Sequence, residues 1–181
     1  MRKLTDVDRL YQFMRALAAE ADKSACVYFT GGATALLNGW RATTIDVDLK
    51  IVPEQDRLLR AIPRLKEELE INVELASPDD FIPQLPGWEE RSTFVQQQRH
   101  LTFRHYDYYA QALSKLERGH AQDITDVEEM LKRGLIDPKR LLDLFTAIEP
   151  ELYRYPSIDP RSFRRSVEAC VESAGSDASS S

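Results

Sequence analysis

The sequence has few of the features that mark exported, membrane-spanning or zinc-bound proteins. Its only cysteines are Cys26 and Cys170, and its 3 histidines show no zinc-ligand spacing with them or with one another. We interpret both thiols as buried side chains rather than as a disulfide or a metal site. No apolar run approaches the length of a membrane span, and the N-terminus has no apolar signal core. We therefore expect a cytoplasmic protein with no membrane partner.

Several catalytic and binding signatures are also missing. There is no Walker A loop and no Gly-x-Ser-x-Gly nucleophile motif. The net charge of −6 argues against a protein that mainly coats nucleic acid, because such proteins usually carry a basic surface. It leaves room for an enzyme that holds an RNA end locally. An acidic metal site would contribute to the negative count, and bound Mg²⁺ would offset it.

The most informative segment combines a glycine pair with two closely spaced aspartates. Gly31 and Gly32 close the apolar run Tyr28-Phe-Thr-Gly-Gly-Ala-Thr-Ala-Leu-Leu37, and Thr44-Ile-Asp-Val-Asp-Leu49 follows after a gap. In a strand, Asp46 and Asp48 project to one face, and we expect Ile45, Val47 and Leu49 to face the core. Neighbouring carboxylates repel unless a cation compensates, and Mg²⁺ is typically held by one or two carboxylates and substrate phosphates.

The glycine pair supplies the other half of such a site. Glycine lets the backbone approach a phosphate closely, and a helix N-terminus favours anions. We therefore interpret Gly31, Gly32 and Thr34 as contacts of a nucleoside triphosphate, against the alternative of an ordinary strand-to-helix turn. A phosphate cradle that faces bound metal is the apparatus of nucleotidyl transfer.

This pattern resembles the nucleotidyltransferase superfamily typified by DNA polymerase beta. More narrowly, the chain resembles small bacterial nucleotidyltransferases related to the abortive-infection toxins of toxin–antitoxin pairs, over roughly residues 25 to 160. The residues that carry the narrower resemblance are Arg41, Thr44, Ser77-Pro-Asp-Asp-Phe-Ile-Pro83 and Lys115-Leu-Glu-Arg-Gly-His-Ala-Gln-Asp-Ile-Thr-Asp126. The resemblance implies an enzyme that uses an NTP as substrate and two Mg²⁺ ions as cofactors.

The resemblance also implies further site residues. A third carboxylate from a neighbouring strand often serves as general base or second-metal ligand, and Glu74 fits if its strand pairs beside Asp46 and Asp48; an ordinary exposed glutamate is the alternative, and Asp79 and Asp80 are weaker substitutes. Periodicity alone makes Lys115 a solvated lysine. The toxin-like enzymes carry such a lysine followed by aspartates, which implies that Lys115 is a catalytic residue that holds nucleotide phosphates. It also implies that Asp123 or Asp126 orients this lysine or contacts the nucleotide.

The element pattern predicts an α+β nucleotidyltransferase fold, a small mixed sheet with flanking helices followed by a helical C-terminal half. We expect a core over residues 1–105, a helical region packed on it over 106–172, and a disordered tail over 173–181. Residues 54–69 should form a helix that kinks or divides at Pro63, and 76–91 a long loop. If that helix is continuous, Arg57, Arg60 and Arg64 form a basic stripe, which is by default a solvated face and by hypothesis an RNA contact.

The main hypothesis is a Mg²⁺-dependent nucleotidyltransferase that moves an NMP from an NTP to an acceptor hydroxyl. By resemblance, the acceptor would be a tRNA 3′ end or a protein, and the enzyme a toxin neutralised by a cognate antitoxin. Two alternatives stay open: an inactive nucleotidyltransferase fold that serves as a binding module, and an aminoglycoside-type enzyme that modifies a small molecule.

Overall fold

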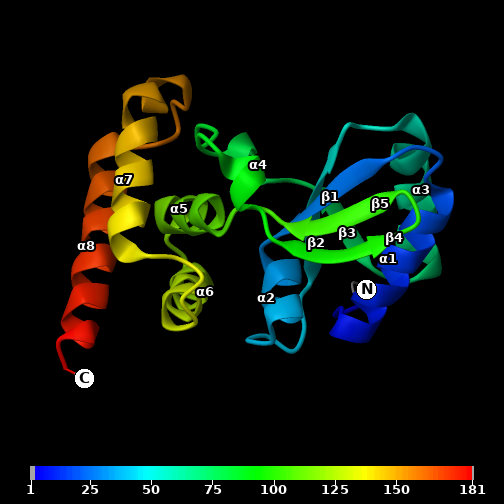
Figure 1. Ribbon diagram of the computed structural model, residues 1–181, viewed down its shortest axis with the longest axis horizontal. Coiled ribbons are helices and arrows are strands. Elements are labelled where there is room, and N and C mark those ends of the chain that lie inside the picture. Colours follow the sequence, from blue (N-terminus) through cyan, green and yellow to red (C-terminus); the bar gives the residue numbers. More distant parts are fainter. Residues whose placement is uncertain (1–2, 181) are drawn as a thin grey trace. The chain divides into compact units, whose positions relative to one another are not determined.

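The computed structural model describes residues 3–180 (Figure 1) and divides into two compact units. The first unit contains the chain up to Ser77 together with Ser92–Tyr106, and the second contains Pro78–Arg91 and the chain from Asp107 onward. The expected single boundary after residue 105 is therefore replaced by an interleaved one. A segment that the sequence places inside the core belongs to the helical unit.

The first unit is built on a five-stranded sheet with the strand order β3-β2-β1-β5-β4. The pairs β1–β2 and β4–β5 are antiparallel, and β1–β5 and β2–β3 are parallel. This mixed sheet with flanking helices, followed by a helical C-terminal part, confirms the α+β prediction. The elements of the unit are α1 (Val7–Glu20), β1 (Ala25–Thr30), α2 (Gly32–Asn38), β2 (Asp46–Val52), α3 (Asp56–Glu68), β3 (Asn72–Leu75), β4 (Phe94–Gln98) and β5 (Leu101–His105).

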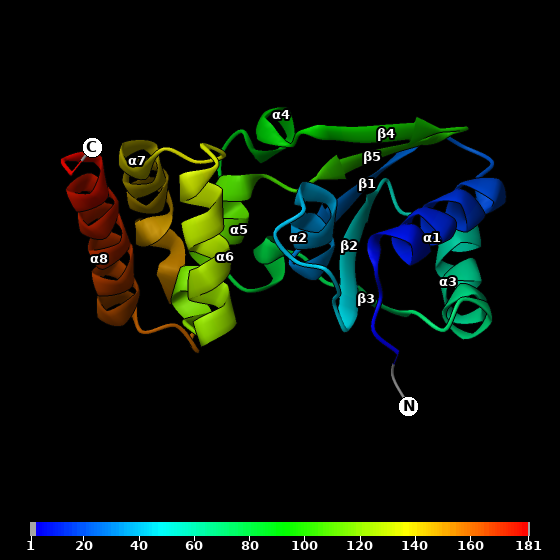
Figure 2. The ribbon, with the colours of Figure 1, turned by 90° about the horizontal axis from the view of Figure 1, so that it is seen from below.

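Helices α1 and α3 cover one face of this sheet (Figure 2). Strand β2 alternates between half-buried and buried residues, and its apolar residues Val47, Leu49 and Ile51 belong to the hydrophobic core. They pack with apolar side chains of both helices, including Phe13 and Leu58. Because side chains alternate along a strand, burying these three residues turns Asp46, Asp48 and Lys50 to the other face.

Helix α3 is one continuous helix across Pro63, where the sequence predicts a kink or a division. A proline inside a helix costs about 3 kcal/mol, because it removes one backbone hydrogen bond and crowds the preceding turn. The helix buries Leu58, Ala61, Ile62 and Leu65. Burial of a single large aliphatic side chain contributes about 1.5–3 kcal/mol, so this apolar face outweighs the cost of the proline.

Ile45 differs from its expected place in the core, since its side chain is 52% exposed. Strand β2 begins one residue later, and its pairing with β3 begins with Asp46 opposite Asn72. Residue 45 therefore lacks the strand neighbours that would place it under a helix. Just before it, Thr44 forms an isolated bridge with Thr5.

The second unit is helical. Its elements are a 3-10 helix (Pro78–Asp80), α4 (Trp88–Arg91), α5 (Tyr108–Arg118), α6 (Ala121–Lys132), α7 (Pro138–Ile148), a 3-10 helix (Glu149–Arg154) and α8 (Pro160–Ala178). Two contacts explain why the segment 78–91 joins it. Arg91 donates to Asp107 Oδ2 at 2.7 Å, and this buried aspartate also caps α5 by accepting from the Tyr109 backbone N–H. Tyr155 donates its hydroxyl to the Asp79 carbonyl at 3.4 Å.

The end of the chain also differs from the prediction. Helix α8 runs to Ala178, through most of the expected disordered tail 173–181; Ser181 lies outside the described residues. The helix is anchored at its start, where Phe163 packs edge-on against Phe145 of α7 with the ring centroids 4.8 Å apart. The serine hydroxyls near its end donate to backbone carbonyls one turn earlier, a local hydrogen bond that serine forms inside helices. Among residues 3–180, no helix combines the length and apolarity that a membrane crossing needs.

The two isoleucines of the β2 region give a matched test of this core assignment. We expect Ile51→Ala to lower the free energy of unfolding by about 2–5 kcal/mol, because it leaves a cavity in the core. Ile45→Ala should change it by no more than about 0.5 kcal/mol, because the side chain is exposed. Urea unfolding of both variants would measure the difference, and equal losses would contradict the assignment.

Candidate active site

The glycine pair forms a tight turn between β1 and α2. Gly31 has φ +60°, a backbone conformation that residues with a side chain rarely adopt. A Cβ on Gly32 would lie 2.6 Å from the Thr44 Cβ, so a side chain there would displace Thr44. A Cβ on Gly31 would lie 3.2 Å from Asp48 Oδ2. The backbone of the turn therefore packs directly against the carboxylate of Asp48.

Three carboxylates lie on adjacent strands beside this turn. Strand β3 pairs in parallel with β2, with Glu74 opposite Asp48, so the condition for bringing Glu74 next to the aspartates is met. Asp48 also lies opposite Thr30, the last residue of β1 before the turn. Because paired strands run about 4.8 Å apart, the site gathers Gly31, Asp46, Asp48 and Glu74 in one small region. The functional roles of these residues stay predictions.

Asn72 is a site residue that the sequence analysis missed. Its side-chain amide donates to Asp46 Oδ1, and it also lies 3.5 Å from Glu74 Oε1. An amide donor between two carboxylates reduces their repulsion and fixes their orientation. A signal was available in the sequence, because Asn72 precedes Glu74 by two residues and so shares its face of the strand.

The oxygen donors of this site fit a Mg²⁺ ion whose remaining ligands come from water and the phosphates of a substrate. Among the described residues, no three His, Cys, Asp or Glu side chains converge as a ready-made metal cage. Mg²⁺ rarely uses such cages; it binds through one or two carboxylates and takes its remaining ligands from water and phosphates. Asp46 and Asp48 are two hard oxygen donors on one strand face, next to a glycine turn that can admit phosphate. Asp46 and Asp48 therefore have the chemistry that a Mg²⁺ site needs.

Thr34, which we expected to contact the triphosphate, is buried between α2 and the sheet. Its side chain is fully buried, and its hydroxyl donates to the Phe29 carbonyl at 3.3 Å. The same hydroxyl lies 3.1 Å from Nδ1 of His105. The third residue of α2 therefore turns its side chain toward the ends of β1 and β5, because that side of the short helix packs against the sheet.

His105 is a second residue that sequence reasoning missed. It ends β5, and burial lowers the pKa of its imidazole from 6.5 to about 4. The ring is therefore neutral at pH 7. Leu101 and Phe103 are buried on alternate positions of the same strand, so the period-two pattern could have indicated that His105 is buried as well.

In the second unit, Lys115 is buried and ion-paired, not solvated as its periodicity suggests. Its ammonium donates to Asp126 Oδ2 at 2.8 Å and lies 3.6 Å from Asp123 Oδ1. Arg118 binds Asp123 through two hydrogen bonds of 2.8 and 2.5 Å, and the His120 N–H also donates to Asp123. Burial alone would raise the pKa of Asp123, but Arg118, Lys115 and the His120 N–H together hold it below its usual value. The structure thus brings Lys115, Asp123 and Asp126 together as one group.

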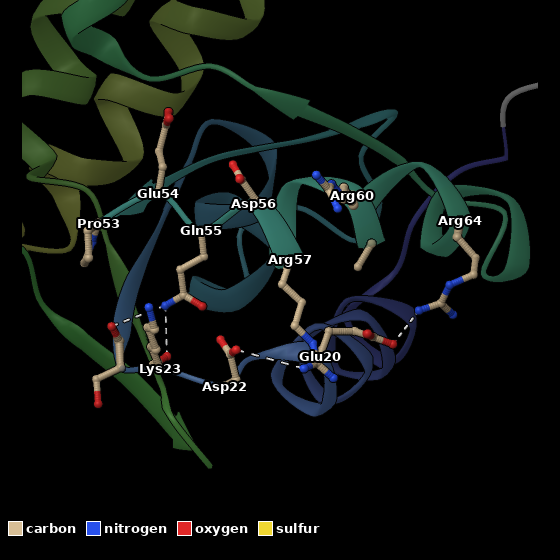
Figure 3. A pocket seen from close by; sticks show the side chains of 12 residues that line it. Glu20, Asp22, Lys23, Pro53, Glu54, Gln55, Asp56, Arg57, Arg60 and Arg64 are labelled. Carbon is tan, nitrogen blue, oxygen red and sulfur yellow. Dashed lines mark hydrogen bonds and ion pairs between the residues drawn. The ribbon is translucent and has the colours of Figure 1, made fainter.

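The predicted arginine stripe lines a separate cavity of about 920 Å³ (Figure 3). Pairing of Cys26 with Val52 and of Thr30 with Asp48 places this cavity at the other end of β1 and β2 from the acids, about 13 Å along the strands. Its lining residues are Glu20, Asp22, Lys23, Ser24, Pro53, Glu54, Gln55, Asp56, Arg57, Arg60, Ala61 and Arg64.

Acidic neighbours offset much of the positive charge of the stripe. Arg64 pairs with Glu20 and Glu68, and Arg57 lies 4.0 Å from Asp22. Four acids line the cavity beside four basic residues, namely Glu20, Asp22, Glu54 and Asp56 against Lys23, Arg57, Arg60 and Arg64. A cavity of balanced charge attracts a phosphate backbone less than three unpaired arginines would.

A mixed sheet with flanking helices, whose glycine turn packs against an Asp-x-Asp strand, defines a nucleotidyltransferase-like fold. A family model described as "nucleotidyltransferase of unknown function (DUF6036)" matches residues 2–169. The chain belongs to this family. No curated protein and no solved structure matches the chain significantly.

The buried ion pairs of α5 and α6 should matter for stability. We expect Lys115→Met to lower the free energy of unfolding by about 3–5 kcal/mol, because it leaves buried Asp126 without its cation. Lys139→Met removes an exposed lysine of α7 and is the matched control, with an expected change within about 0.5 kcal/mol. Urea unfolding at pH 7 measures both variants. A loss at Lys115 no larger than at Lys139 would show that the network does not stabilise the fold.

Buried His105 should make stability fall in mild acid. Its pKa is lowered in the folded state, so the unfolded chain takes up the proton first and the stabilisation is present above pH 6.5. About 3 kcal/mol should be lost as the pH falls from 6.5 to about 4. His105→Gln should remove this component from the pH dependence of unfolding, and His100→Gln, at an exposed position, should retain it. Parallel curves for all three proteins would contradict the assignment.

Proposed function

We propose that the protein is a Mg²⁺-dependent nucleotidyltransferase that moves an NMP from an NTP to an acceptor hydroxyl and releases pyrophosphate. The observation that carries this proposal is the packing of the Gly31 turn against Asp48, with Asp46 and Glu74 on the same sheet face. Membership of a nucleotidyltransferase family supports the reaction class. Metal dependence, acceptor and biological role belong to the proposal.

The candidate site residues of the first unit would each have a chemical task in this reaction. Asp46 and Asp48 would hold Mg²⁺, which would act as a Lewis acid that offsets the negative charge of the phosphates and makes the attacking hydroxyl more acidic. The backbone of the Gly31 turn would receive the triphosphate. Glu74 would take the proton of the acceptor hydroxyl while the oxygen of that hydroxyl attacks the α-phosphorus. The bond from the α-phosphorus to the pyrophosphate oxygen then breaks, and pyrophosphate leaves. Asn72 would keep the carboxylates oriented through its two amide contacts.

Lys115 and the aspartates that it contacts belong to the helical unit. The resemblance implies that Lys115 holds nucleotide phosphates and that Asp123 or Asp126 contacts the nucleotide. Because Lys115 donates to Asp126, we propose that Asp126 is the acid that orients it, while Asp123 is mainly held by Arg118. By resemblance alone, the acceptor would be a tRNA 3′ end or a protein, and the protein a toxin with a cognate antitoxin.

The test is incubation of the purified protein with each α-³²P-labelled NTP, Mg²⁺, total tRNA and lysate protein. We expect label in tRNA or in a protein band, and loss of at least about 100-fold in Asp48→Asn, because the variant weakens the metal site. Asp8→Asn makes the same change at an exposed position of α1 and should retain full transfer. Melting temperatures of both variants with and without Mg²⁺·NTP would separate lost binding from lost folding.

Full activity in a folded Asp48→Asn protein would rule out this mechanism. Nucleotide binding without any labelled macromolecule would favour a small-molecule acceptor. If the protein neither binds the nucleotide nor transfers label, an inactive binding module would be favoured.

A further inference from the structure

The glycine turn needs support from outside its own helix. Helix α2 has only 7 residues, and Gly31 caps it without a side-chain hydrogen bond. Helices this short are not stable alone, and two successive glycines add backbone freedom. A turn that must present backbone N–H groups to phosphates therefore depends on contacts that fix its first residues.

Thr34 and His105 provide such a contact. Thr34 is in the first turn of α2, and its hydroxyl lies 3.1 Å from Nδ1 of His105 and 3.3 Å from the Phe29 carbonyl. The Tyr106 N–H donates to the same Phe29 carbonyl at 2.8 Å. The start of α2 is thus joined to the ends of two paired strands by a small group of buried hydrogen bonds.

The histidine side of this contact is rigid. Phe29 and His105 are register partners in the parallel pair β1–β5. The backbone N–H of His105 also donates to the Thr93 carbonyl at 2.8 Å. The next residue after His105, Tyr106, is also buried, and its ring packs edge-on against that of Tyr28 with the centroids 6.1 Å apart. Because the imidazole is neutral at pH 7, the contact adds no charge beside the phosphate site. Its effect is on geometry.

We propose that Thr34 and His105 are positioning residues that hold the glycine turn against Asp48 for binding of a nucleoside triphosphate. This inference rests on the proposed function. A shift of the first turn of α2 would change the contact of Gly31 with Asp48 Oδ2, where a Cβ would already lie at 3.2 Å. Because small displacements in a site weaken what it holds, a buried hydrogen bond that sets this contact would affect the nucleotide site without touching the nucleotide.

The test compares Mg²⁺·NTP affinity in variants that differ by one hydroxyl. Thr34→Val keeps the branched shape and removes the hydrogen bond, and it should weaken the Kd for Mg²⁺·NTP about three- to tenfold. Thr34→Ser restores the hydroxyl and should recover most of the affinity. Thr102→Val is the matched control. It removes an exposed hydroxyl of β5 that donates to Gln97. His105→Leu should weaken binding as Thr34→Val does, and the double variant should add little to either change.

Calorimetric titration well below each melting temperature separates positioning from folding. A lower melting temperature in Thr34→Val with an unchanged Kd would mean a structural role only, and would overturn the proposal while the proposed function stands. No Mg²⁺·NTP binding by the wild-type protein would overturn both. Weakened binding that Thr34→Ser does not recover would show that shape, not the hydrogen bond, matters, and would also overturn it.

Discussion

The antiparallel pairing of β1 with β2 is the constraint on which the candidate site depends. Its register sets Thr30 opposite Asp48, so the turn that follows β1 meets the carboxylates at the start of β2. The same register points Val47 and Leu49 into the core. A slip of one residue would expose the apolar side chains and bury the aspartates. Burial energy in the core therefore fixes the position of the acids, although the acids themselves contribute repulsion.

The acidic side chains of the two units differ in their burial and in their partners. In the first, Asp46 is half-buried, Glu74 is exposed, and both lie within reach of the Asn72 side-chain amide. In the second, Lys115, Asp123 and Asp126 are buried and matched by one another and by Arg118. Buried ion pairs are held by their geometry and hydrogen bonds against the cost of desolvation, whereas solvent-accessible carboxylates are the type of ligand that Mg²⁺ uses in proteins.

Local patterns account for the parts of the structure that the sequence predicted well. Alternation with period two located β2 and β3, and the glycine pair located the turn, because each depends on neighbours in the chain. Asn72 and His105 were missed, and Lys115 was read from its periodicity as solvated, because their contacts are set by strand register and helix packing. The segment 78–91 read as a loop of the core because its anchors, Asp107 and Tyr155, are distant in sequence. Ile45 was misplaced because the alternation was extended one residue beyond the strand.

The interleaved boundary bears on the order in which the chain can fold during synthesis. Strand β5 lies between β1 and β4, so the sheet of the first unit stays incomplete until residues 101–105 have been made. The segment 78–91 emerges earlier, but Asp107, which binds Arg91, comes later. The first unit can therefore be completed once Tyr106 has been made, whereas the segment 78–91 must wait for helices that are synthesised later. Domains that are contiguous in sequence usually fold one after another from the N-terminus without such a waiting segment. For the same reason, no single cut in the chain separates the two units intact.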